Sequence, residues 1–299
     1  MPDQLVRLHL REPDLLVVGL LCSETARRAR DMHRCLPTSA GVFAQGLAAG
    51  LGVAGVLAGR ARINLQLACD GPVKGMFIDA DAEGKVRGYV HNPQVNFLSD
   101  EPRFDTAGAL GRNGMLSVLR ELKAGEYYRG SVSMDHAELA RDLERYYLES
   151  EQIDTLVQLE VRRDGDEQLG RVAGLFVQAM PDAQPGTMKD VRTRLQGALW
   201  RLLEAGRPAR AFDVVRPVLD LFPGQEPEIM AEYPLGYFCS CSKERSVRAV
   251  IAMGRAEIED LLRTEGRAVA TCAFCESVYE VTGEELQKIL AGVDPLAAT

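Results

Sequence analysis

The chain has 299 residues, a formal net charge of −8 and a hydrophobic content of 46%. This length and composition allow one sizeable core plus a smaller unit, so we expect a folded protein. The negative charge argues against general binding to nucleic acids or anionic membranes. The chain shows no basic leader followed by a short apolar run, and its seven cysteines are an odd number. We therefore expect a protein of the reducing cytoplasm.

The first 180 residues predict an α+β domain that is rich in strands. Apolar residues alternate from Leu5 to Leu10, and the stretch from Leu15 to Leu21 is almost entirely apolar, so both predict strands. Ser23 begins a charged helix, and Asp135 and Glu138 resemble a capping box for a second helix. Alternating or apolar runs predict further strands at 63–67, 76–79, 86–90, 115–119, 127–134, 155–163 and 171–180.

An uncharged run from Leu36 to Gly59 is long enough to suggest a membrane span. It consists mostly of glycine and alanine, contains Gln45, and has no second span to accompany it. A helix that is apolar on all sides can also lie at the centre of a domain, where small residues let sheets pack close. We favour the buried helix and expect no membrane association.

Residues 181–234 predict a helical linker between two domains. Apolar residues recur at helical spacing through Val191, Leu195, Leu199 and Leu202, and a second amphipathic turn follows around Val215. Flexible linkers are not this apolar, so we expect the segment to pack on the first domain. The alternative is a helical bridge that only connects the domains.

Two close pairs of cysteines stand out in the last quarter of the chain. Cys239 and Cys241 flank one residue, Cys272 and Cys275 flank two, and thirty residues separate the pairs. In an extended segment residues two apart point the same way, and a two-residue turn brings both thiols of the second pair to one metal. We therefore predict one four-thiolate zinc site formed by these cysteines. The alternative is two unrelated pairs of buried cysteines.

The region around these pairs predicts a small domain that depends on the metal. Ser242 precedes a short helix, and Thr282 with Glu285 forms a capping-box pattern before another. About sixty residues with few large apolar side chains make a marginal core. Four cations lie close in sequence to the cysteines: Lys243, Arg245, Arg248 and Arg267. They either offset the negative charge of the zinc-bound thiolates or form an ordinary solvated face.

The spacing of the first pair also favours a redox switch. A disulfide between residues two apart closes a small ring and departs from relaxed geometry, and strained disulfides tend to be reversible. The other three cysteines lie in apolar surroundings and are interpreted as small buried hydrophobic residues, namely Cys22, Cys35 and Cys69.

The stretch from Tyr237 to Arg245, followed by the Cys272–Cys275 pair and Tyr279, resembles the redox-regulated 33 kDa heat-shock chaperone, the HslO family. Signatures of that family's main domain also recur in order, at 71–74, 86–89, 92–93 and 150–152. The resemblance covers nearly the full length. It implies a main domain of sheets enclosing a buried helix over 1–180, the helical linker at 181–234 and a zinc-binding redox domain at 235–299.

The resemblance also implies a function. The zinc-bound form would be inactive, and the oxidised form would be an ATP-independent holdase, often dimeric, that binds unfolding client proteins. We expect oxidation to join Cys239 to Cys241 and Cys272 to Cys275, because sequence neighbours meet fastest once the metal has left.

Two other classes of function fit the sequence less well. A zinc-ribbon nucleic-acid module needs a basic face, yet the segment from Gly236 to Thr299 has seven basic and ten acidic residues. A thiol–disulfide oxidoreductase would place its active pair at a helix start in a thioredoxin-like unit, and this pattern is absent. No nucleophile–base motif accompanies His33, His91 or His136, so we expect no enzyme.

Overall fold

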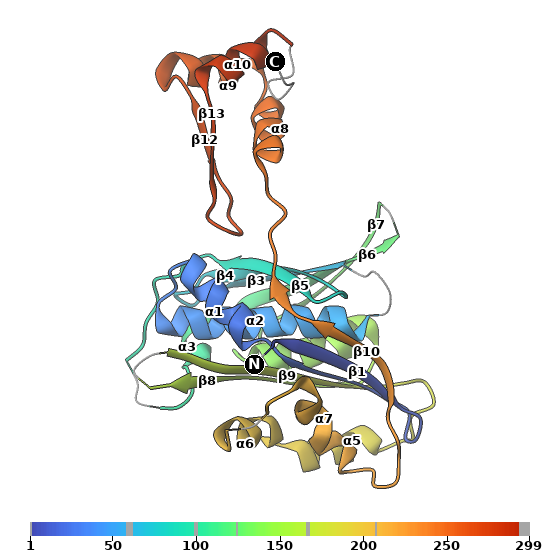
Figure 1. Ribbon diagram of the computed structural model, residues 1–299. Coiled ribbons are helices and arrows are strands. Elements are labelled where there is room, and N and C mark those ends of the chain that lie inside the picture. Colours follow the sequence, from blue (N-terminus) through green and yellow to red (C-terminus); the bar gives the residue numbers. More distant parts are fainter. Residues whose placement is uncertain are drawn as a thin grey trace. The chain divides into compact units, whose positions relative to one another are not determined.

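The computed structural model describes residues 2–57, 62–98, 101–123, 125–165, 168–206 and 208–292. The chain divides into two compact units, Met1–Phe238 and Cys239–Thr299. The first unit is α+β (Figure 1). Two sheets enclose one helix, and a further layer of helices covers the outer face of one sheet.

One sheet of the first unit has five antiparallel strands in the order β10-β1-β2-β9-β8. Strand β2 is buried along its whole length, because one of its faces packs on a central helix and the other on the linker helices. This explains its continuous apolar sequence. The strands are β1 (Gln4–Leu10), β2 (Leu15–Leu21), β8 (Thr155–Asp164), β9 (Gln168–Ala179) and β10 (Glu228–Pro234).

The second sheet has six strands in the order β11-β5-β4-β3-β6-β7. Its strands alternate buried and partly exposed residues, as expected for a sheet with one face on the core. All neighbours are antiparallel except the short β11, which runs parallel to β5. The strands are β3 (Arg62–Cys69), β4 (Gly75–Asp81), β5 (Lys85–Val90), β6 (Gly114–Lys123), β7 (Glu126–Ser133) and β11 (Gly236–Tyr237).

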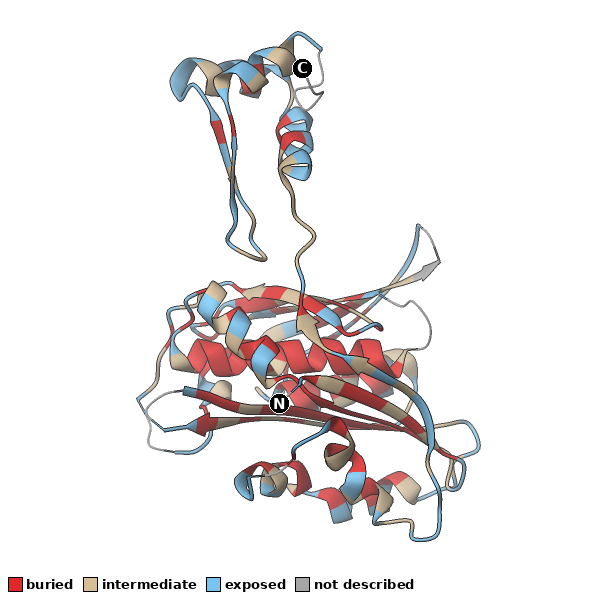
Figure 2. Ribbon diagram, in the orientation of Figure 1, coloured by how far each residue is buried: buried red, intermediate tan, exposed pale blue. Residues whose placement is uncertain are grey.

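Helix α2 (Pro37–Val56) lies between the two sheets (Figures 1 and 2). It buries 18 of its 20 residues, and a side chain added at Gly52 would clash with the ring of Phe176. Within the part of the chain that the structure describes, α2 alone is long and apolar enough to cross a membrane, and 94% of its most apolar window is buried inside the protein. The buried-helix interpretation of the uncharged run is confirmed, and the end of that run, Ala58 and Gly59, lies outside the described residues.

Shorter helices pack against α2 in the first unit, and one of them begins differently from the prediction. Asp135 and Glu138 form no capping box, because Ala137 has a positive φ of 52° and the side chain of Glu138 makes no capping bond. Instead the carboxylate of Asp142 accepts the backbone N–H of Asp135 at 3.3 Å. The helices are α1 (Ser23–Met32), α3 (Thr106–Leu110), α4 (Leu139–Tyr146) and the π-helical turn η1 (Tyr147–Glu151).

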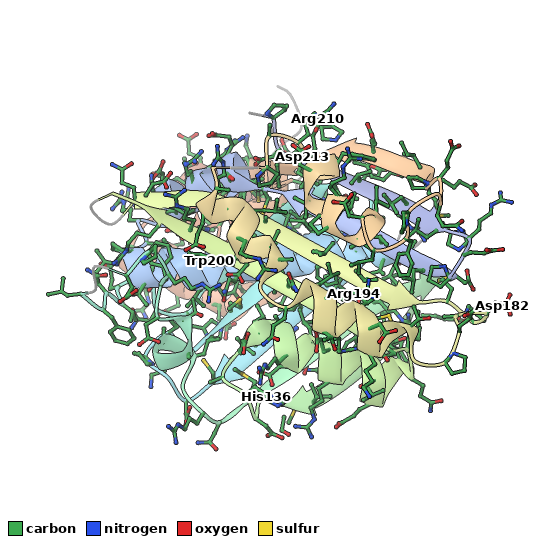
Figure 3. The ribbon with its side chains drawn as sticks, turned by 90° about the horizontal axis from the view of Figure 1, so that it is seen from below. His136, Asp182, Arg194, Trp200, Arg210 and Asp213 are labelled. Atoms are coloured by element: carbon green, nitrogen blue, oxygen red, sulfur yellow. The ribbon has the colours of Figure 1, made fainter. Side chains whose placement is uncertain are left out.

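Three linker helices cover the face of the five-stranded sheet that is turned away from α2 (Figure 3). They are α5 (Thr187–Leu195), α6 (Ala198–Glu204) and α7 (Ala211–Leu219). Leu199 is fully buried and Leu202 partly so, which agrees with the predicted packing of this segment on the first domain.

Polar side chains on strand β8 hold the ends of these helices. The side chain of Gln158 donates to the carbonyl of Leu195 at 2.7 Å and accepts the N–H of Leu199 at 3.2 Å. The guanidinium of Arg103 lies 3.9 Å from the ring centre of Trp200 on α6 and 3.2 Å from the carboxylate of Glu160. The linker is therefore fixed by directed contacts as well as by apolar packing.

Strands β10 and β11 lead the chain from the linker helices to the second unit. The first joins the edge of the five-stranded sheet beside β1, and the second joins the six-stranded sheet beside β5. At the end of β11 the hydroxyl of the buried Tyr237 donates to the carbonyl of Gly88 at 2.7 Å and lies 3.1 Å from Nε2 of His33. The chain is thus anchored to the first unit at Tyr237, two residues before Cys239.

Candidate metal centre

The first cysteine pair lies in an irregular segment that ends in a well-capped helix. Helix α8 (Lys243–Met253) begins after Ser242, whose hydroxyl accepts the N–H of Arg245 at 3.4 Å. The predicted cap is confirmed. Cys239 and Cys241 stand immediately before this cap, and both are half-buried.

The second pair occupies the turn of a hairpin. Strands β12 (Ala268–Thr271) and β13 (Val278–Val281) pair in antiparallel register. Between them the N–H of Cys272 donates to the carbonyl of Ser277 at 2.9 Å, and its own carbonyl accepts the N–H groups of Cys275 and Glu276. This tight turn is the expected two-residue knuckle.

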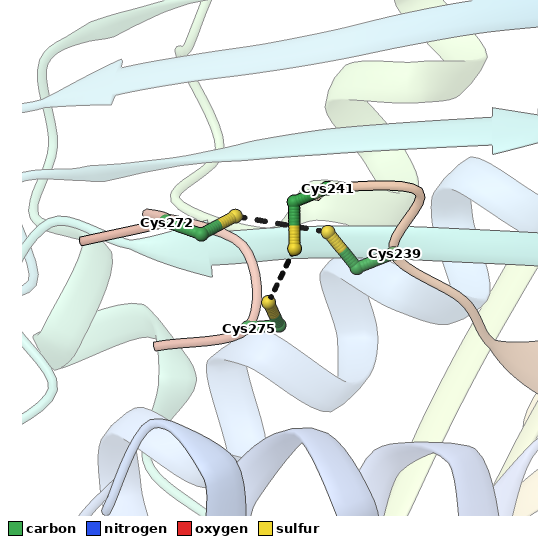
Figure 4. Close-up of side chains that lie close together, drawn as sticks. All are labelled: Cys239, Cys241, Cys272 and Cys275. Carbon is green, nitrogen blue, oxygen red and sulfur yellow. Dashed lines mark hydrogen bonds between the residues drawn. The ribbon is translucent and has the colours of Figure 1, made fainter. Parts of the chain in front are cut away.

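The structure brings the four sulfurs together (Figure 4). All of them lie within 4.8 Å of one another, with 3.7 Å between the sulfurs of Cys239 and Cys272 and 3.1 Å between those of Cys241 and Cys275. Sulfurs that bind one zinc at about 2.3 Å in a tetrahedron lie roughly 3.8 Å apart. The cluster therefore has the size and the donor set of a four-thiolate zinc site.

Two hydroxyl groups that the sequence analysis did not assign to the site contact these sulfurs. The hydroxyl of Tyr279 lies 3.1 Å from Sγ of Cys241, and that of Ser277 lies 3.3 Å from Sγ of Cys275. Cys275, Ser277 and Tyr279 are spaced two residues apart as the chain enters β13. The two-residue period of an extended segment could therefore have indicated that these side chains share a face.

The close approach of the sulfurs separates their pKa values. Desolvation raises the pKa of Cys241 to about 12; the hydrogen bond to Tyr279 opposes this rise, and hydrogen bonds to the other three thiols add to it. Desolvation also acts against ionisation of Cys275, but hydrogen bonds with Ser277 and Cys241 prevail and lower its pKa to about 7. Four thiolates this close repel one another, so a divalent cation is the natural partner of the fully ionised set.

The cations near the cysteines are engaged with other groups. Lys243 forms an ion pair with Glu285 at 2.9 Å, and Arg267 pairs with Glu280 at 3.2 Å. Arg245 donates to the hydroxyl of Ser240, between the first two cysteines, at 2.7 Å. Of these three cations Arg245 alone bonds to a residue that lies between two of the cysteines.

The second unit has a very small apolar core. Helix α9 (Arg255–Thr264) and helix α10 (Gly283–Leu290) complete it, and the predicted capping box of Thr282 and Glu285 is present at the start of α10. Its fully buried cluster has six members, which are Val247, Val250, Ile258, Ala268, Val281 and Leu286. Such a core is marginal for about sixty residues, which agrees with a unit that depends on a metal.

The three remaining cysteines belong to the first unit. Cys22 and Cys35 are buried, and desolvation raises the pKa of Cys35 to about 12 and that of Cys22 well above its usual value. Cys69 is half-buried and its pKa is also raised by desolvation. These thiols are poorly ionised at neutral pH, as expected for small core residues.

Known proteins match this chain over almost its whole length. The family described as Hsp33 protein matches residues 3–282. The 33 kDa chaperonin of Halalkalibacterium halodurans is 32% identical over 97% of this chain and 99% of its own length. The 33 kDa chaperonin of Bacillus subtilis is 30% identical over 95% of this chain and 97% of its own.

A solved structure agrees with the observed fold. The crystal structure of the 33 kDa chaperonin from Thermotoga maritima matches with a TM-score of 0.78 and 24% identity. The match covers 98% of this chain and 99% of that one. From the extent of the family match and the identity to its curated relatives, we conclude that the chain belongs to the Hsp33 protein family.

Proposed function

We propose that the protein is a redox-regulated, ATP-independent holdase that binds unfolding proteins after oxidation of its four clustered cysteines. The observation that carries the proposal is the convergence of four sulfurs within 4.8 Å in a unit whose described residues form a buried core of six members. The chaperone part is supported by the Hsp33 family and by relatives named 33 kDa chaperonin.

In the reduced state Cys239, Cys241, Cys272 and Cys275 hold one zinc ion. Bound zinc supplies the cross-link between the first pair and the hairpin that the small core cannot provide. Structural zinc in small domains contributes about 10 to 16 kcal/mol. We therefore expect the second unit to be folded when reduced and unfolded once the thiolates are lost.

Oxidation by a peroxide removes the ligands in two steps for each pair. One thiolate attacks a peroxide oxygen, which gives a sulfenic acid and releases hydroxide. The second thiol then attacks the sulfenic sulfur, forms the disulfide and releases water, so each disulfide consumes one peroxide. Disulfide formation releases the metal, because a disulfide sulfur is a poor zinc ligand.

We expect the bonds Cys239–Cys241 and Cys272–Cys275. In the reduced cluster the short sulfur contacts run between the pairs, from Cys239 to Cys272 and from Cys241 to Cys275. Closing a loop of two or three residues costs much less chain entropy than closing one of more than thirty, so pairing within each motif is favoured once the unit has unfolded.

Client binding needs apolar surface, and the linker helices cover a large area of it. They pack on the five-stranded sheet through an apolar cluster that includes Leu175 and Val177 of β9 and Leu199 and Val215 of the linker. Loosening of this layer would expose both faces, and exposed apolar patches bind other exposed apolar surface. We propose unfolded proteins as partners and a possible homodimer of the oxidised form, in the cytoplasm under stress.

The two rival functions receive no support from the site. The thioredoxin type of active pair lies at a helix start within a βαβ unit. The second pair lies in a hairpin turn, and the first pair, although it precedes helix α8, is followed by helix α9 and an antiparallel hairpin and not by the parallel strand of such a unit. The net charge of −8 is unfavourable for nucleic-acid and anionic membrane partners. We propose that the protein binds neither nucleic acids nor membranes and that it is not an enzyme.

The test compares reduced, zinc-loaded protein with protein treated with peroxide. Zinc release, loss of structure in the second unit and suppression of client aggregation should rise together without nucleotide. Dithiothreitol plus zinc should reverse all three. Cys69→Ser, at a half-buried cysteine outside the site, serves as a control and should respond like the parent. Equal protection of the client by the reduced and oxidised forms would refute the proposal.

A further inference from the structure

The hydroxyl of Tyr279 lies 3.1 Å from Sγ of Cys241, although 38 residues separate them in the sequence. Tyr279 is on β13, where it pairs with Ala270 of β12, so the hairpin fixes its backbone. Cys241 belongs to the segment that precedes α8. The phenol therefore connects the hairpin that carries the second cysteine pair to the segment that carries the first.

A phenol has one proton to donate, and a thiolate can only accept it. A hydrogen bond donated to Cys241 would stabilise the negative charge of the thiolate sulfur. It would also occupy one lone pair and so fix the direction of the others. Both effects bear on a metal ligand, because groups behind the ligands orient them and adjust their basicity. Donation also makes a thiolate less nucleophilic, so its attack on an oxidant becomes slower.

We propose that Tyr279 is a positioning residue that holds the Cys241 sulfur toward the metal and sets how readily the site is oxidised. This inference rests on the proposed zinc site and deepens its regulation. Ser277 differs from Tyr279 because its hydroxyl contacts Cys275 within the same hairpin. The phenol of Tyr279 joins the two halves of the site, so its loss affects the assembly of all four ligands.

The experiment uses the full-length variant Tyr279→Phe, which keeps the ring and removes only the hydroxyl. Tyr127→Phe is the matched control, because Tyr127 is an exposed tyrosine on β7 of the first unit. Zinc affinity is measured under reducing conditions by competition with a chromogenic chelator, and zinc release is followed after addition of peroxide. We expect affinity about 10- to 100-fold weaker in Tyr279→Phe and unchanged in the control. Zinc release should be several-fold faster, in proportion to the gain in nucleophilicity.

A third measurement separates positioning from mere support of the fold. Cobalt(II) in place of zinc gives a sulfur-to-metal charge-transfer band, which moves to lower energy when a sulfur loses a hydrogen bond. We expect this shift in Tyr279→Phe and none in Tyr127→Phe. Weaker binding with an unmoved band would overturn the proposal, because it would mean that the phenol only stabilises the fold. Parent-like affinity and release rate would overturn it as well.

These readouts do not involve client proteins. If the parent fails to protect clients after oxidation while Tyr279→Phe shows weaker binding and a shifted band, the proposed function fails and the role of Tyr279 stands. If the parent behaves as a redox-regulated chaperone and Tyr279→Phe matches it in every metal measurement, the role of Tyr279 fails alone. A parent that binds no zinc would overturn both.

Discussion

The two units of this chain are stabilised in different ways. The first encloses a helix with 18 of 20 residues buried between two sheets and adds a second apolar layer under the linker. Among the residues that the structure describes, the second has six buried core residues and four clustered sulfurs. Burial of apolar surface responds little to oxidants, whereas thiolate ligation is abolished by them. On the proposed function, one chain therefore combines a core that persists on oxidation with a unit whose folding responds to the redox state.

The largest expected effect comes from removing one ligand. In Cys272→Ser the neutral hydroxyl is a poor zinc ligand, so most of the roughly 10 to 16 kcal/mol of metal binding should be lost. The second unit should then unfold while α2 and the two sheets of the first remain native. Hydrogen exchange resolved along the chain would show protection lost after Phe238, reduced in the linker helices α5 to α7, and retained in α2 and the two sheets. Full zinc retention and a protected second unit would remove Cys272 from the site.

A smaller effect is expected from charges placed beneath the linker. Replacing Leu199 and Leu202 with Asp puts carboxylates into an apolar layer, at a cost of about 3 to 5 kcal/mol for each that stays buried. The linker should loosen, and the reduced protein should suppress client aggregation. Lys189→Asp, which changes the charge on an exposed position of α5, is the control. A reduced double variant as inactive as the parent would make the linker a passive bridge.

The stability of the first unit should also depend on pH through Glu160. Desolvation raises the pKa of this carboxyl from 4.5 to about 7, aided by Glu138 and Glu204 and opposed by Arg103. A raised folded pKa stabilises the fold fully below about 4.5, and this contribution disappears as pH rises through about 7. We expect the free energy of unfolding to fall by about 1 to 3 kcal/mol across this window. Glu160→Gln should flatten the slope, and an unchanged slope would refute the assignment.

The smallest effect should come from the ion pair of Lys243 and Glu285 in the second unit. The two side chains are 35% and 19% exposed, so the pair should contribute about 1 kcal/mol or less. Lys243→Met should weaken apparent zinc affinity about fivefold at most. Arg255→Met, at the more exposed pair with Glu259, should change it less. A loss as large as that of a cysteine ligand would show that this pair, and not the metal, organises the unit.

Periodic features of the sequence predicted much of this structure. The uncharged run predicted the burial of helix α2, because a helix without a polar side must be buried on every face. The spacing of the cysteines predicted the sulfur cluster, because two short motifs each bring two thiols to one side.

Other features depend on contacts between distant residues. Strand β10 was not expected, because its sequence Glu228–Pro234 is acidic and does not alternate; it becomes a strand by pairing with β1. The capping pattern at Asp135 failed because Ala137 has a positive φ and because the carboxylate of Asp142, seven residues along the chain, accepts the N–H of Asp135. The contact of Tyr279 with Cys241 depends on the hairpin register, which local patterns do not specify.

The anchor at Tyr237 has a consequence for the rate at which the second unit refolds after reduction. Because Tyr237 is bonded to Gly88 inside the first unit, the cysteine-bearing segment that unfolds with the second unit begins at Cys239 and stays attached to the first unit while both sheets are intact. A flexible segment of about 60 residues has a root-mean-square span of roughly 45 Å, so all four thiols remain near a fixed point of the same molecule. Recovery after reduction is then a unimolecular reaction whose half-time, at saturating zinc, should not change with protein concentration.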